Sequence, residues 1–476
     1  MTGKNRIILG ADAGTHGVRI LAMQLPDCTV IAQSVSNYSR EIDADTQEMD
    51  AREFETALFS ALDRLDLPQN SSVAAMGITH QRGTVIPVDS RCYPLGPAIC
   101  DSDNRALGPS GFKAVGIDPE HYYYRSGCPV VSFNGLTKIL WYKKHFPEEW
   151  SNVYAWLSPQ DYLISRLTGK LQLSEGSVMR SGFLDVHKRT VWKDLLPDAS
   201  FLDLPCVPVA KSCGRIDSQW INKYSCLSAT ELFAVPGDQP SAYIGSGAGK
   251  NTVVMNLGTT FVASVASEVP VKDPDCKITN EILPEGLYAP EFGTGAGGQF
   301  MEFVANIFDV ATDWSVIESE AQTIPSGSDG LQTVPLLWQV TSHNIDGRIR
   351  GFRPFHTRGH IFRSAYEGLA YETRLSIQKI ARQTIDPEDI HVFGGLSDSG
   401  IFLQILANVL AIPVKVAVHK QASAFGAGLT SALGLGVFPD LESVTALAGA
   451  PDRVYYPQKE EETFYEKEFQ RYKYQR

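Results

Sequence analysis

One carboxylate in the middle of the chain stands in a setting suited to chemistry. Asp238 follows Gly237 and precedes Gln239 and Pro240, so it lies in a tight turn between an apolar segment and a segment of small residues. Such a turn restricts the backbone and aims the side chain in one direction. A carboxylate held in this way can accept a proton or cap a helix, and for the turn taken alone helix capping is the favoured interpretation.

A second candidate carboxylate lies near the start of the chain. Residues 6–23 read as strand, turn and strand, with Asp12 and Gly14 in the turn. The glycine lets successive backbone N–H groups form a nest that binds an anion, and Asp12 at its mouth is placed to hold a hydrated divalent cation against a phosphate. The plan recurs at 252–265, around Gly258 and Thr259. Two matching hairpins half a chain apart predict two domains of like fold.

Polar clusters also follow two predicted strands between these hairpins. Gln81 and Arg82 end the apolar segment that begins at 72, and Asp101 and Asp103 lie in the polar group at 98–105. Proteins of the α/β class place ligand contacts at such strand ends, although solvated loops have the same composition. Predicted amphipathic helices follow these clusters, and their lysines and aromatic rings are assigned to packing and surface.

The last third of the chain contains a strand that leads through Gly394 and Gly395 into a predicted helix at 401–411. Ser397 or Ser399 would cap that helix. A strand, a double glycine and a helix N-terminus suit a nucleotide phosphate or ribose. The small residues at 422–433 predict a helix pressed closely on a sheet. Residues 293–298 satisfy G-x-G-x-x-G, but Pro290 makes the preceding segment a poor parallel strand, so a turn opening a helix at 299–308 is preferred.

Composition excludes several classes of protein. The 476 residues include 42 basic and 54 acidic side chains, a formal charge of −12 that opposes nucleic acid binding. The first apolar run is too short for a signal sequence or a membrane span, so we expect a cytoplasmic protein without a membrane partner. Eight cysteines without a C-x-x-C pair indicate neither a zinc site nor a disulfide framework.

Taken together, these segments resemble the FGGY carbohydrate kinases over nearly the whole chain and in the family's motif order. Residues 12–19 are similar to the first phosphate hairpin, 237–239 to the catalytic Gly-Asp-Gln, and 256–260 to the second phosphate hairpin. Residues 347–351 with 360–367 resemble the family's second signature. The family's adenosine-site segment is resembled by Gly394, Gly395 and the helix at 422–429.

The resemblance implies an α/β fold of two actin/hexokinase-like (ribonuclease H-like) domains flanking an interdomain cleft. Residues 1–242 would bind the acceptor and supply the base, and residues 243–476 would mainly bind nucleotide. ATP and Mg²⁺ are the implied cofactors, and the partner is a small-molecule sugar or polyol. The oligomeric state is left open, a homodimer included.

The resemblance also implies roles for particular residues. Asp238 would be the catalytic base, and with Asp12 it would hold the metal. The remaining acceptor contacts would be Gln81, Arg82, Asp101, Asp103 and Gln239. The remaining nucleotide contacts would be Asp12, Gly14, Thr15, His16, Arg19, Gly258, Thr259, Thr260, Gly394, Gly395 and Ser397.

Three departures from the family pattern bear on specificity. His16 stands where Thr or Ser is usual, which weakens the case for a side-chain phosphate contact there. Gln81 and Arg82 resemble the Gln-Arg-Glu of glycerol kinase, but Gly83 replaces the glutamate. Asp101 replaces the usual tryptophan, which favours a more hydroxylated acceptor than glycerol.

The leading hypothesis is therefore an ATP-dependent kinase of a free ketose or polyol, of the xylulokinase kind. Glycerol kinase is the alternative within the class. An actin-like or chaperone-type ATPase without an acceptor is the alternative from another class, and a fold that only binds sugar is the third. The sequence of 237–239 favours the kinase, because it resembles the kinase base.

Overall fold

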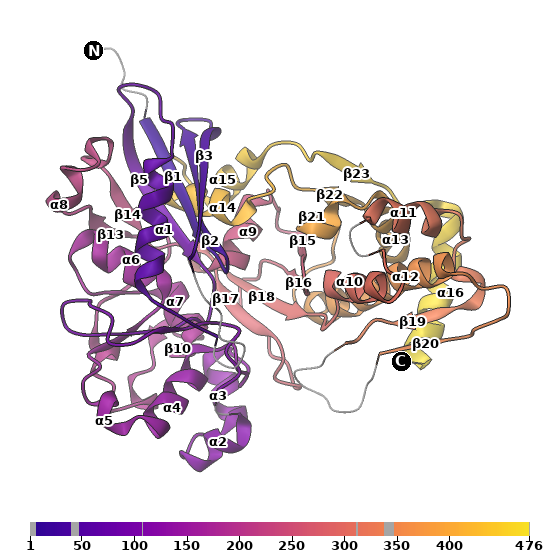
Figure 1. Ribbon diagram of the computed structural model, residues 1–476, viewed down its shortest axis with the longest axis horizontal. Coiled ribbons are helices and arrows are strands. Elements are labelled where there is room, and N and C mark those ends of the chain that lie inside the picture. Colours follow the sequence, from indigo (N-terminus) through magenta and orange to yellow (C-terminus); the bar gives the residue numbers. More distant parts are fainter. Residues whose placement is uncertain (1–5, 40–46, 107, 311–312, 338–346, 476) are drawn as a thin grey trace. The chain divides into compact units, whose positions relative to one another are not determined.

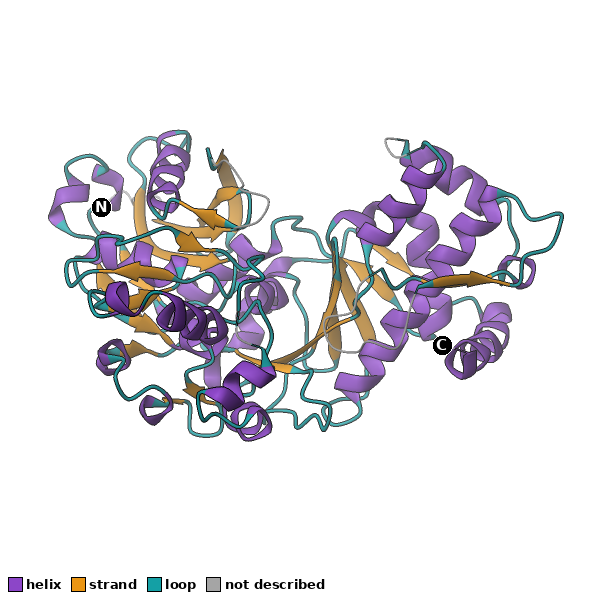
Figure 2. Ribbon diagram, turned by 60° about the horizontal axis from the view of Figure 1, so that its bottom comes forward, coloured by secondary structure: helices purple, strands orange, loops and turns teal. Residues whose placement is uncertain are grey.

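The structure is a computed structural model that describes residues 6–39, 47–106, 108–310, 313–337 and 347–475 (Figure 1). Two compact units make up the chain, and each contains a sheet flanked by helices (Figure 2). The first unit comprises Met1–Gly245, Ser267–Ala289 and Gln421–Ala448, and the second comprises Ser246–Ala266, Pro290–Lys420 and Gly449–Arg476. Within the described residues, no helix has the length and apolar character needed to cross a membrane.

A six-stranded sheet forms the centre of the first unit, in the order β13-β14-β5-β1-β2-β3. β1 pairs with β2 as an antiparallel hairpin and with β5 in parallel, and β5 pairs in parallel with β14. The strand, turn and strand predicted at 6–23 are confirmed. The strands of this sheet are β1 (Arg6–Ala13), β2 (Gly17–Gln24), β3 (Thr29–Asn37), β5 (Ser72–His80), β13 (Ser212–Arg215) and β14 (Glu231–Phe233).

Helices α14 (Ala422–Gly434) and α9 (Asp238–Gly245) pack against each other, and α14 contacts β1 and β5. Glycine permits this close approach. A Cβ atom at Gly10 of β1 would lie 2.0 Å from the carbonyl oxygen of Ala424, and one at Gly245 of α9 would lie 2.0 Å from that of Ala422. The predicted helix of small residues pressed on a sheet is confirmed.

The remaining elements of the first unit surround this sheet. α1 buries Phe54, Leu58 and Ala61 on one face, as expected of an amphipathic helix. The helices are α1 (Arg52–Asp63), α2 (Pro109–Ala114), α3 (Pro119–Ser126), α4 (Gly135–His145), α5 (Pro147–Trp150), α6 (Pro159–Thr168), α7 (Glu175–Ser181), α8 (Ser218–Ile221) and α15 (Leu441–Thr445). The short strands are β4 (Glu48–Met49), β6 (Ile86–Val88), β7 (Ala98–Ile99), β8 (Ala155–Leu157), β9 (Leu173–Ser174), β10 (Leu184–Asp185), β11 (Thr190–Val191), β12 (Cys206–Val207) and β17 (Thr279–Ile282).

The sheet of the second unit repeats the plan of the first. β15 forms an antiparallel hairpin with β16 and pairs in parallel with β21, so the hairpin predicted at 252–265 is confirmed. The order is β18-β16-β15-β21-β22-β23. These strands are β15 (Thr252–Leu257), β16 (Phe261–Ser264), β18 (Tyr288–Gly293), β21 (Asp389–Phe393), β22 (Val414–Val416) and β23 (Arg453–Tyr455).

The segment before the G-x-G-x-x-G pattern is β18, a strand despite Pro290, and it pairs with β16 in the antiparallel direction. The predicted helix after it is confirmed as α10. Ser399 caps α13 by accepting a hydrogen bond from the backbone N–H of Phe402. The helices of this unit are α10 (Gly298–Ile307), α11 (Trp314–Gln322), α12 (Arg358–Ala381), α13 (Gly400–Leu410) and α16 (Lys459–Gln475), with a two-stranded ribbon of β19 (Gln332–Val334) and β20 (Arg348–Arg350).

The predicted boundary at 242/243 divides the chain into two consecutive segments, whereas the compact units do not. Ser267–Ala289 and Gln421–Ala448 belong to the first unit by spatial contact. The second of these segments carries α14, whose small residues fit it to β1 and β5. Residues from the second half of the sequence therefore lie close to Asp238.

Candidate active site

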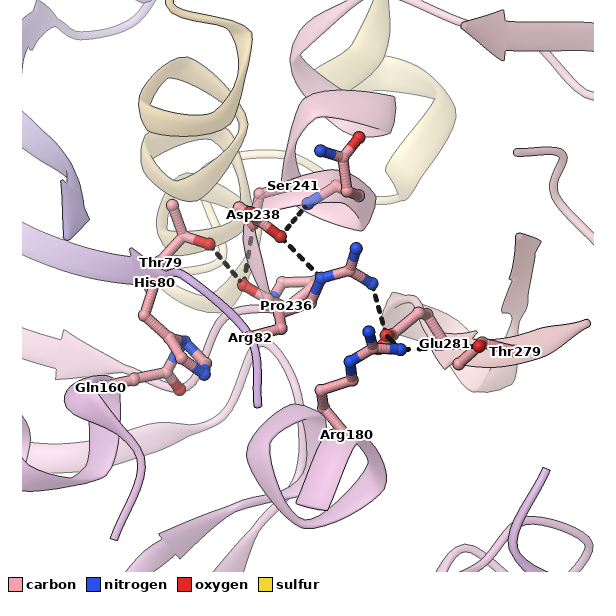
Figure 3. A network of polar contacts seen from close by, with 11 residues as sticks. Thr79, His80, Arg82, Gln160, Arg180, Pro236, Asp238, Ser241, Thr279 and Glu281 are labelled. Carbon is pink, nitrogen blue, oxygen red and sulfur yellow. Dashed lines mark hydrogen bonds and ion pairs between the residues drawn. The ribbon is translucent and has the colours of Figure 1, made fainter. Parts of the chain in front are cut away.

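The turn that carries Asp238 is fixed from two sides. The hydroxyl groups of Thr79, at the end of β5, and Ser241, in α9, donate hydrogen bonds to the carbonyl oxygen of Pro236 at 2.8 and 2.9 Å (Figure 3). A Cβ atom at Gly237 would lie 2.4 Å from Cδ of Arg82, so glycine is needed for the arginine to lie along this turn. The sequence Pro-Gly-Asp thus brings the carboxylate of Asp238 and the guanidinium group of Arg82 together.

Asp238 accepts two hydrogen bonds on one oxygen. Arg82 Nε donates to Oδ1 at 2.6 Å, and the backbone N–H of Gln239 donates to the same atom at 2.7 Å. Pro240 has no N–H, and Ser241 N–H bonds to the carbonyl oxygen of Gly237, so the usual capping bonds are not made. Oδ2 accepts no hydrogen bond from the described residues, and 29% of the side chain is exposed.

Arg82 also reaches a second carboxylate. Its Nη1 atom forms an ion pair with Glu281 of β17, whose side chain is only 1% exposed. Arg180 of α7 contacts the same glutamate, with Nη1 3.5 Å from Oε1 (Figure 3). The guanidinium group of Arg82 therefore bridges Asp238 and Glu281, and this holds the orientation of the candidate base.

Asp12 lies at the end of β1, next to the strand that leads to Arg82. It stands opposite Thr79 in the parallel pair of β1 and β5, and the N–H of Gln81 donates to the carbonyl oxygen of Ala13 at 2.9 Å. Burial and the negative charge of Asp238 raise the pKa of Asp12 to about 7. Arg19 offsets this only partly, with Nη1 3.9 Å from Oδ2.

A divalent cation fits this carboxylate. Oδ1 of Asp12 is buried and has no hydrogen-bond partner in the described parts of the chain. An unsatisfied carboxylate oxygen beside a second carboxylate is the hard ligand environment that Mg²⁺ prefers. The positive charge of an ion would offset both the burial of Asp12 and its repulsion by Asp238.

Apart from Arg19, the first hairpin surrounds Asp12 with backbone groups and uncharged side chains. The N–H of Gly14 donates to the carbonyl oxygen of Gly17 at 3.1 Å, which closes the turn. Thr15 is half-buried and the side chain of His16 is exposed. The backbone carbonyl of His16 accepts a hydrogen bond from Tyr38, on the loop after β3.

Two predicted acceptor contacts, Gln81 and Asp101, have buried polar atoms without partners among the described residues. Both atoms of the Gln81 amide and Oδ1 of Asp101 are of this kind. Burial raises the pKa of Asp101, and the negative charge of Asp238 adds to this effect. Buried polar atoms are normally hydrogen-bonded, so these atoms indicate a site that a polar ligand completes.

Asp103 has a different environment from Asp101. Its side chain is fully buried and binds Arg105 through both oxygens, with Nε 3.2 Å from Oδ1 and 3.1 Å from Oδ2. Arg105 in turn forms an ion pair with Glu48. The hydrogen-bonding capacity of Asp103 is thus directed at Arg105, and its predicted contact with the acceptor remains a prediction.

The sequence assigns the lysines of this helix to packing or surface, and the structure places Lys138 in the interior rather than at the surface. The side chain is completely buried, and Nζ donates to the carbonyl oxygens of Gly83 at 2.9 Å and Asp101 at 3.3 Å. Burial lowers the pKa of Lys138 to about 8, although the nearby charge of Asp101 opposes the shift. The lysine ties together the two segments that carry the predicted acceptor contacts.

The predicted nucleotide contacts of the second unit lie together at the ends of β15 and β21. Thr259 and Thr260 are exposed in the hairpin turn, where the carbonyl oxygen of Gly258 accepts a hydrogen bond from Gly298. Gly394 has a φ of 99° and lies so close to β15 that a Cβ atom would be 2.8 Å from Oδ1 of Asn256.

The glycine that follows has open space around it. A Cβ atom at Gly395 would meet nothing within 4 Å. Ser397 donates its hydroxyl hydrogen to the carbonyl oxygen of Gly394 at 2.6 Å, which fixes the turn before α13. The arrangement leaves Gly395 exposed in the turn that precedes α13, which suits a phosphate or ribose contact.

Sequence reasoning missed three buried charged residues close to the predicted acceptor contacts: Lys138, Arg180 and Glu281. Arg180 and Glu281 are 101 positions apart and stand in no recognisable motif. In the sequence, a single charged residue in a helix or strand has the same pattern whether its side chain is buried or at the surface. For Lys138, the apolar residues on both sides of it were the only available signal.

Comparison with known proteins agrees with this geometry. The chain matches the family models for the N-terminal domain of the FGGY family of carbohydrate kinases at residues 7–245 and for its C-terminal domain at residues 253–435. It is 24% identical to xylulose kinase of Staphylococcus epidermidis, covering 98% of this chain and 95% of that protein. It is 26% identical to L-fuculokinase of Escherichia coli, covering 96% and 99%.

Among solved structures, gluconate kinase from Lactobacillus acidophilus has a TM-score of 0.89 at 23% identity, with 98% of this chain and 97% of that chain covered. This likeness confirms the two-domain α/β fold. Both halves of the chain match the family's two domains in the expected order. The chain therefore belongs to the FGGY family of carbohydrate kinases.

Proposed function

We propose that this kinase transfers the γ-phosphoryl group of ATP to a hydroxyl group of a free ketose or polyol, with a pentulose as the leading acceptor. The proposal rests above all on the setting of Asp238. One carboxylate oxygen is held by Arg82 and the Gln239 N–H, and the other is available on a half-exposed side chain. An oriented carboxylate with one unused oxygen is what a base for an alcohol requires.

In this proposal Oδ2 of Asp238 accepts the proton of the acceptor hydroxyl as its oxygen attacks phosphorus. Arg82 fixes the direction of the carboxylate, and the turn at Pro236 fixes its position. Phosphoryl transfer depends mainly on positioning and on neutralising charge, so a rigid carboxylate contributes more than a mobile one.

Asp12 would hold Mg²⁺, with Asp238 as the second carboxylate. When bound with ATP, Mg²⁺ neutralises negative charge on the phosphoryl group being transferred. The turn residues Gly14, Thr15, His16 and Arg19 of the first hairpin, and Gly258, Thr259 and Thr260 of the second, would bind phosphates. Gly394, Gly395 and Ser397 would contact the nucleoside.

Several observations support a hydroxylated acceptor. Gln81 and Asp101 have buried polar atoms that no described residue satisfies, and both neighbour the Arg82 segment. Such a site rejects acceptors that lack the matching hydroxyl groups, because buried polar atoms are then left unpaired. The relatives named xylulose kinase and L-fuculokinase support the same direction.

Glycerol is the alternative acceptor, favoured by one feature. Gln81 and Arg82 follow the glycerol kinase pattern, and Arg82 indeed contacts the candidate base. Asp101 is the evidence against glycerol, because it places a partly buried carboxyl group where an apolar ring would pack on a short carbon chain.

An acceptor panel tests the proposal. ADP formation is measured with D-xylulose, D-ribulose, L-fuculose, xylitol and glycerol, each with ATP and Mg²⁺, against a control without acceptor. We expect a ketose to stimulate ADP formation most and glycerol to have a kcat/KM lower by up to ~10⁴-fold. A highest kcat/KM for glycerol contradicts the pentulose assignment, and ATP turnover unaffected by every acceptor favours an ATPase of the actin or chaperone type.

A further inference from the structure

Arg180 and Glu281 form a buried pair in which each side chain has an unused polar atom. The side chains are 9% and 1% exposed, and the Nη1 to Oε1 distance is 3.5 Å. Arg180 Nη1 also lies 3.5 Å from the hydroxyl oxygen of Thr279. Arg180 Nε and Glu281 Oε2 have no hydrogen-bond partner in the part of the chain that the structure describes.

The described residues use only part of the hydrogen-bonding capacity of Arg180. Its guanidinium group offers five donors, and among the described residues it makes two long hydrogen bonds and lies on the ring of Phe133, 4.9 Å from Cζ. Phe133 covers the guanidinium group, which leaves the edge of the arginine to bond a ligand. Leaving a buried donor and a buried acceptor unpaired is costly unless a ligand or water completes them.

Arg82 connects the pair of Arg180 and Glu281 to the candidate base, Asp238. Arg82 contacts Asp238 through Nε and Glu281 through Nη1, so the two carboxylates are separated by the width of one guanidinium group (Figure 3). The pair is therefore close enough to the candidate base for one acceptor molecule to contact both.

We propose that Arg180 and Glu281 bind a hydroxyl group of the acceptor other than the one phosphorylated, and that they make the site select neutral polyhydroxylated acceptors over sugar acids. A hydroxyl group both accepts and donates, so it can take a hydrogen bond from Arg180 and give one to Glu281. A carboxylate only accepts, and next to Glu281 it meets a like charge. This inference rests on the proposed kinase function.

The charges around the pair agree with a neutral ligand. The positive charges of Arg82, Arg180 and Lys138 are matched by the carboxylates of Asp238, Glu281 and Asp101, which leaves no excess positive charge for a carboxylate ligand. A site that binds a sugar acid needs an arginine without a carboxylate partner. In this chain Arg180 is paired with Glu281. The similarity in fold to a gluconate kinase therefore does not imply that this chain prefers sugar acids.

Xylitol and xylonate test the inference, because they share a carbon skeleton and differ only in a CH₂OH or COO⁻ end. Their Kd values for the full chain are measured by isothermal titration calorimetry with ADP and Mg²⁺ present. We expect xylitol to bind at least about tenfold more tightly than xylonate. Equal affinity, tighter binding of xylonate, or no binding of xylitol overturns the inference.

The variant Glu281→Gln removes one charge and keeps the side-chain size. It should reduce the ratio of the two affinities by about tenfold or reverse it, since two arginines then face one carboxylate. Glu175→Gln is the matched control, because Glu175 lies on α7 with Arg180 but pairs with Arg189, at 2.9 Å from Nη2. The control should leave the ratio unchanged.

The two proposals fail in different ways. If no acceptor stimulates ADP formation, the kinase function is wrong, and the calorimetric ratio still reports on Arg180 and Glu281. If a ketose is phosphorylated but Glu281→Gln, folded by its melting temperature, leaves the ratio unchanged, the selection of neutral acceptors has another origin. If Glu281→Gln does not fold, the ratio of the xylitol and xylonate affinities of the unsubstituted protein decides whether the site selects neutral acceptors.

Discussion

Arg82 Nε lies 2.6 Å from Asp238 Oδ1, and the same guanidinium group forms an ion pair with Glu281. The first contact joins the end of β5 to the start of α9, and the second joins both to β17. A planar group with donors on two edges can hold two carboxylates at once. Arg82 is thus the one side chain that fixes the direction of the candidate base, whose position is set by the turn at Pro236.

Replacing Arg82 by lysine tests this dependence. Lysine keeps the charge but presents it as a point, so it cannot hold Asp238 and Glu281 in fixed directions. We expect Arg82→Lys to lower kcat/KM for the acceptor by about 10²-fold, with the KM for ATP nearly unchanged. Steady-state kinetics with each substrate varied in turn measure both values.

Arg166→Lys is the matched control for that variant. Arg166 pairs with Glu55 at 2.8 Å in the same unit, and within the described parts of the chain it makes no hydrogen bond or ion pair with the predicted site. Normal acceptor kinetics are expected from it. An equal loss of kcat/KM in both variants would contradict a specific role for Arg82.

Lys138→Met tests the link between the two acceptor segments. The substitution keeps most of the apolar stem but removes the hydrogen bonds to the carbonyl oxygens of Gly83 and Asp101. We expect the KM for the acceptor to rise by about tenfold, because the two segments are no longer tied. Lys143→Met, on the same helix but exposed and paired with Asp198, should not change this KM.

His80 predicts a loss of stability in acid. Burial lowers the pKa of His80 to about 4 from 6.5, so between these values the unfolded chain binds a proton that the folded protein does not. Stability contributed by neutral His80 is therefore lost as pH falls below 6.5. From pH 7.5 to pH 5 the loss is about 2 kcal/mol.

His80→Gln removes the titrating group, so the variant is compared with the unsubstituted protein. Denaturant unfolding of both proteins at pH 7.5 and pH 5 gives the difference in the free energy of unfolding. The variant should lose about 2 kcal/mol less than the unsubstituted protein over that range. An identical pH dependence of the two proteins would mean that His80 titrates normally in the folded state.

Local patterns predicted the framework of the site well. The hairpins at 6–23 and 252–265, the strand before Arg82, the double glycine before α13 and the small-residue helix α14 each follow from short-range rules. Their residues determine the backbone locally, through alternation, turn glycines or close packing. The residues that depend on them, Asp12 and Asp238, were found for the same reason.

What the sequence could not predict depends on contacts between distant segments. Glu281 belongs to the second half of the chain but packs in the first unit. Arg180 and Lys138 look like surface charges on short helices, and only the packing of β17 and of the segments around Gly83 and Asp101 makes them buried. Partners that lie between 37 and 199 residues apart leave no periodic signal in one sequence.

The base assigned to Asp238 is tested most directly by the kcat of Asp238→Asn, measured together with ATP affinity and melting temperature. Asparagine keeps the size of the side chain and removes its ability to accept the proton. The account predicts a kcat lower by about 10²–10⁴-fold, with a much smaller loss of ATP affinity, because Asp12 still holds Mg²⁺, and with melting temperature little changed. A kcat near that of the unsubstituted protein would contradict the role of Asp238 as the base.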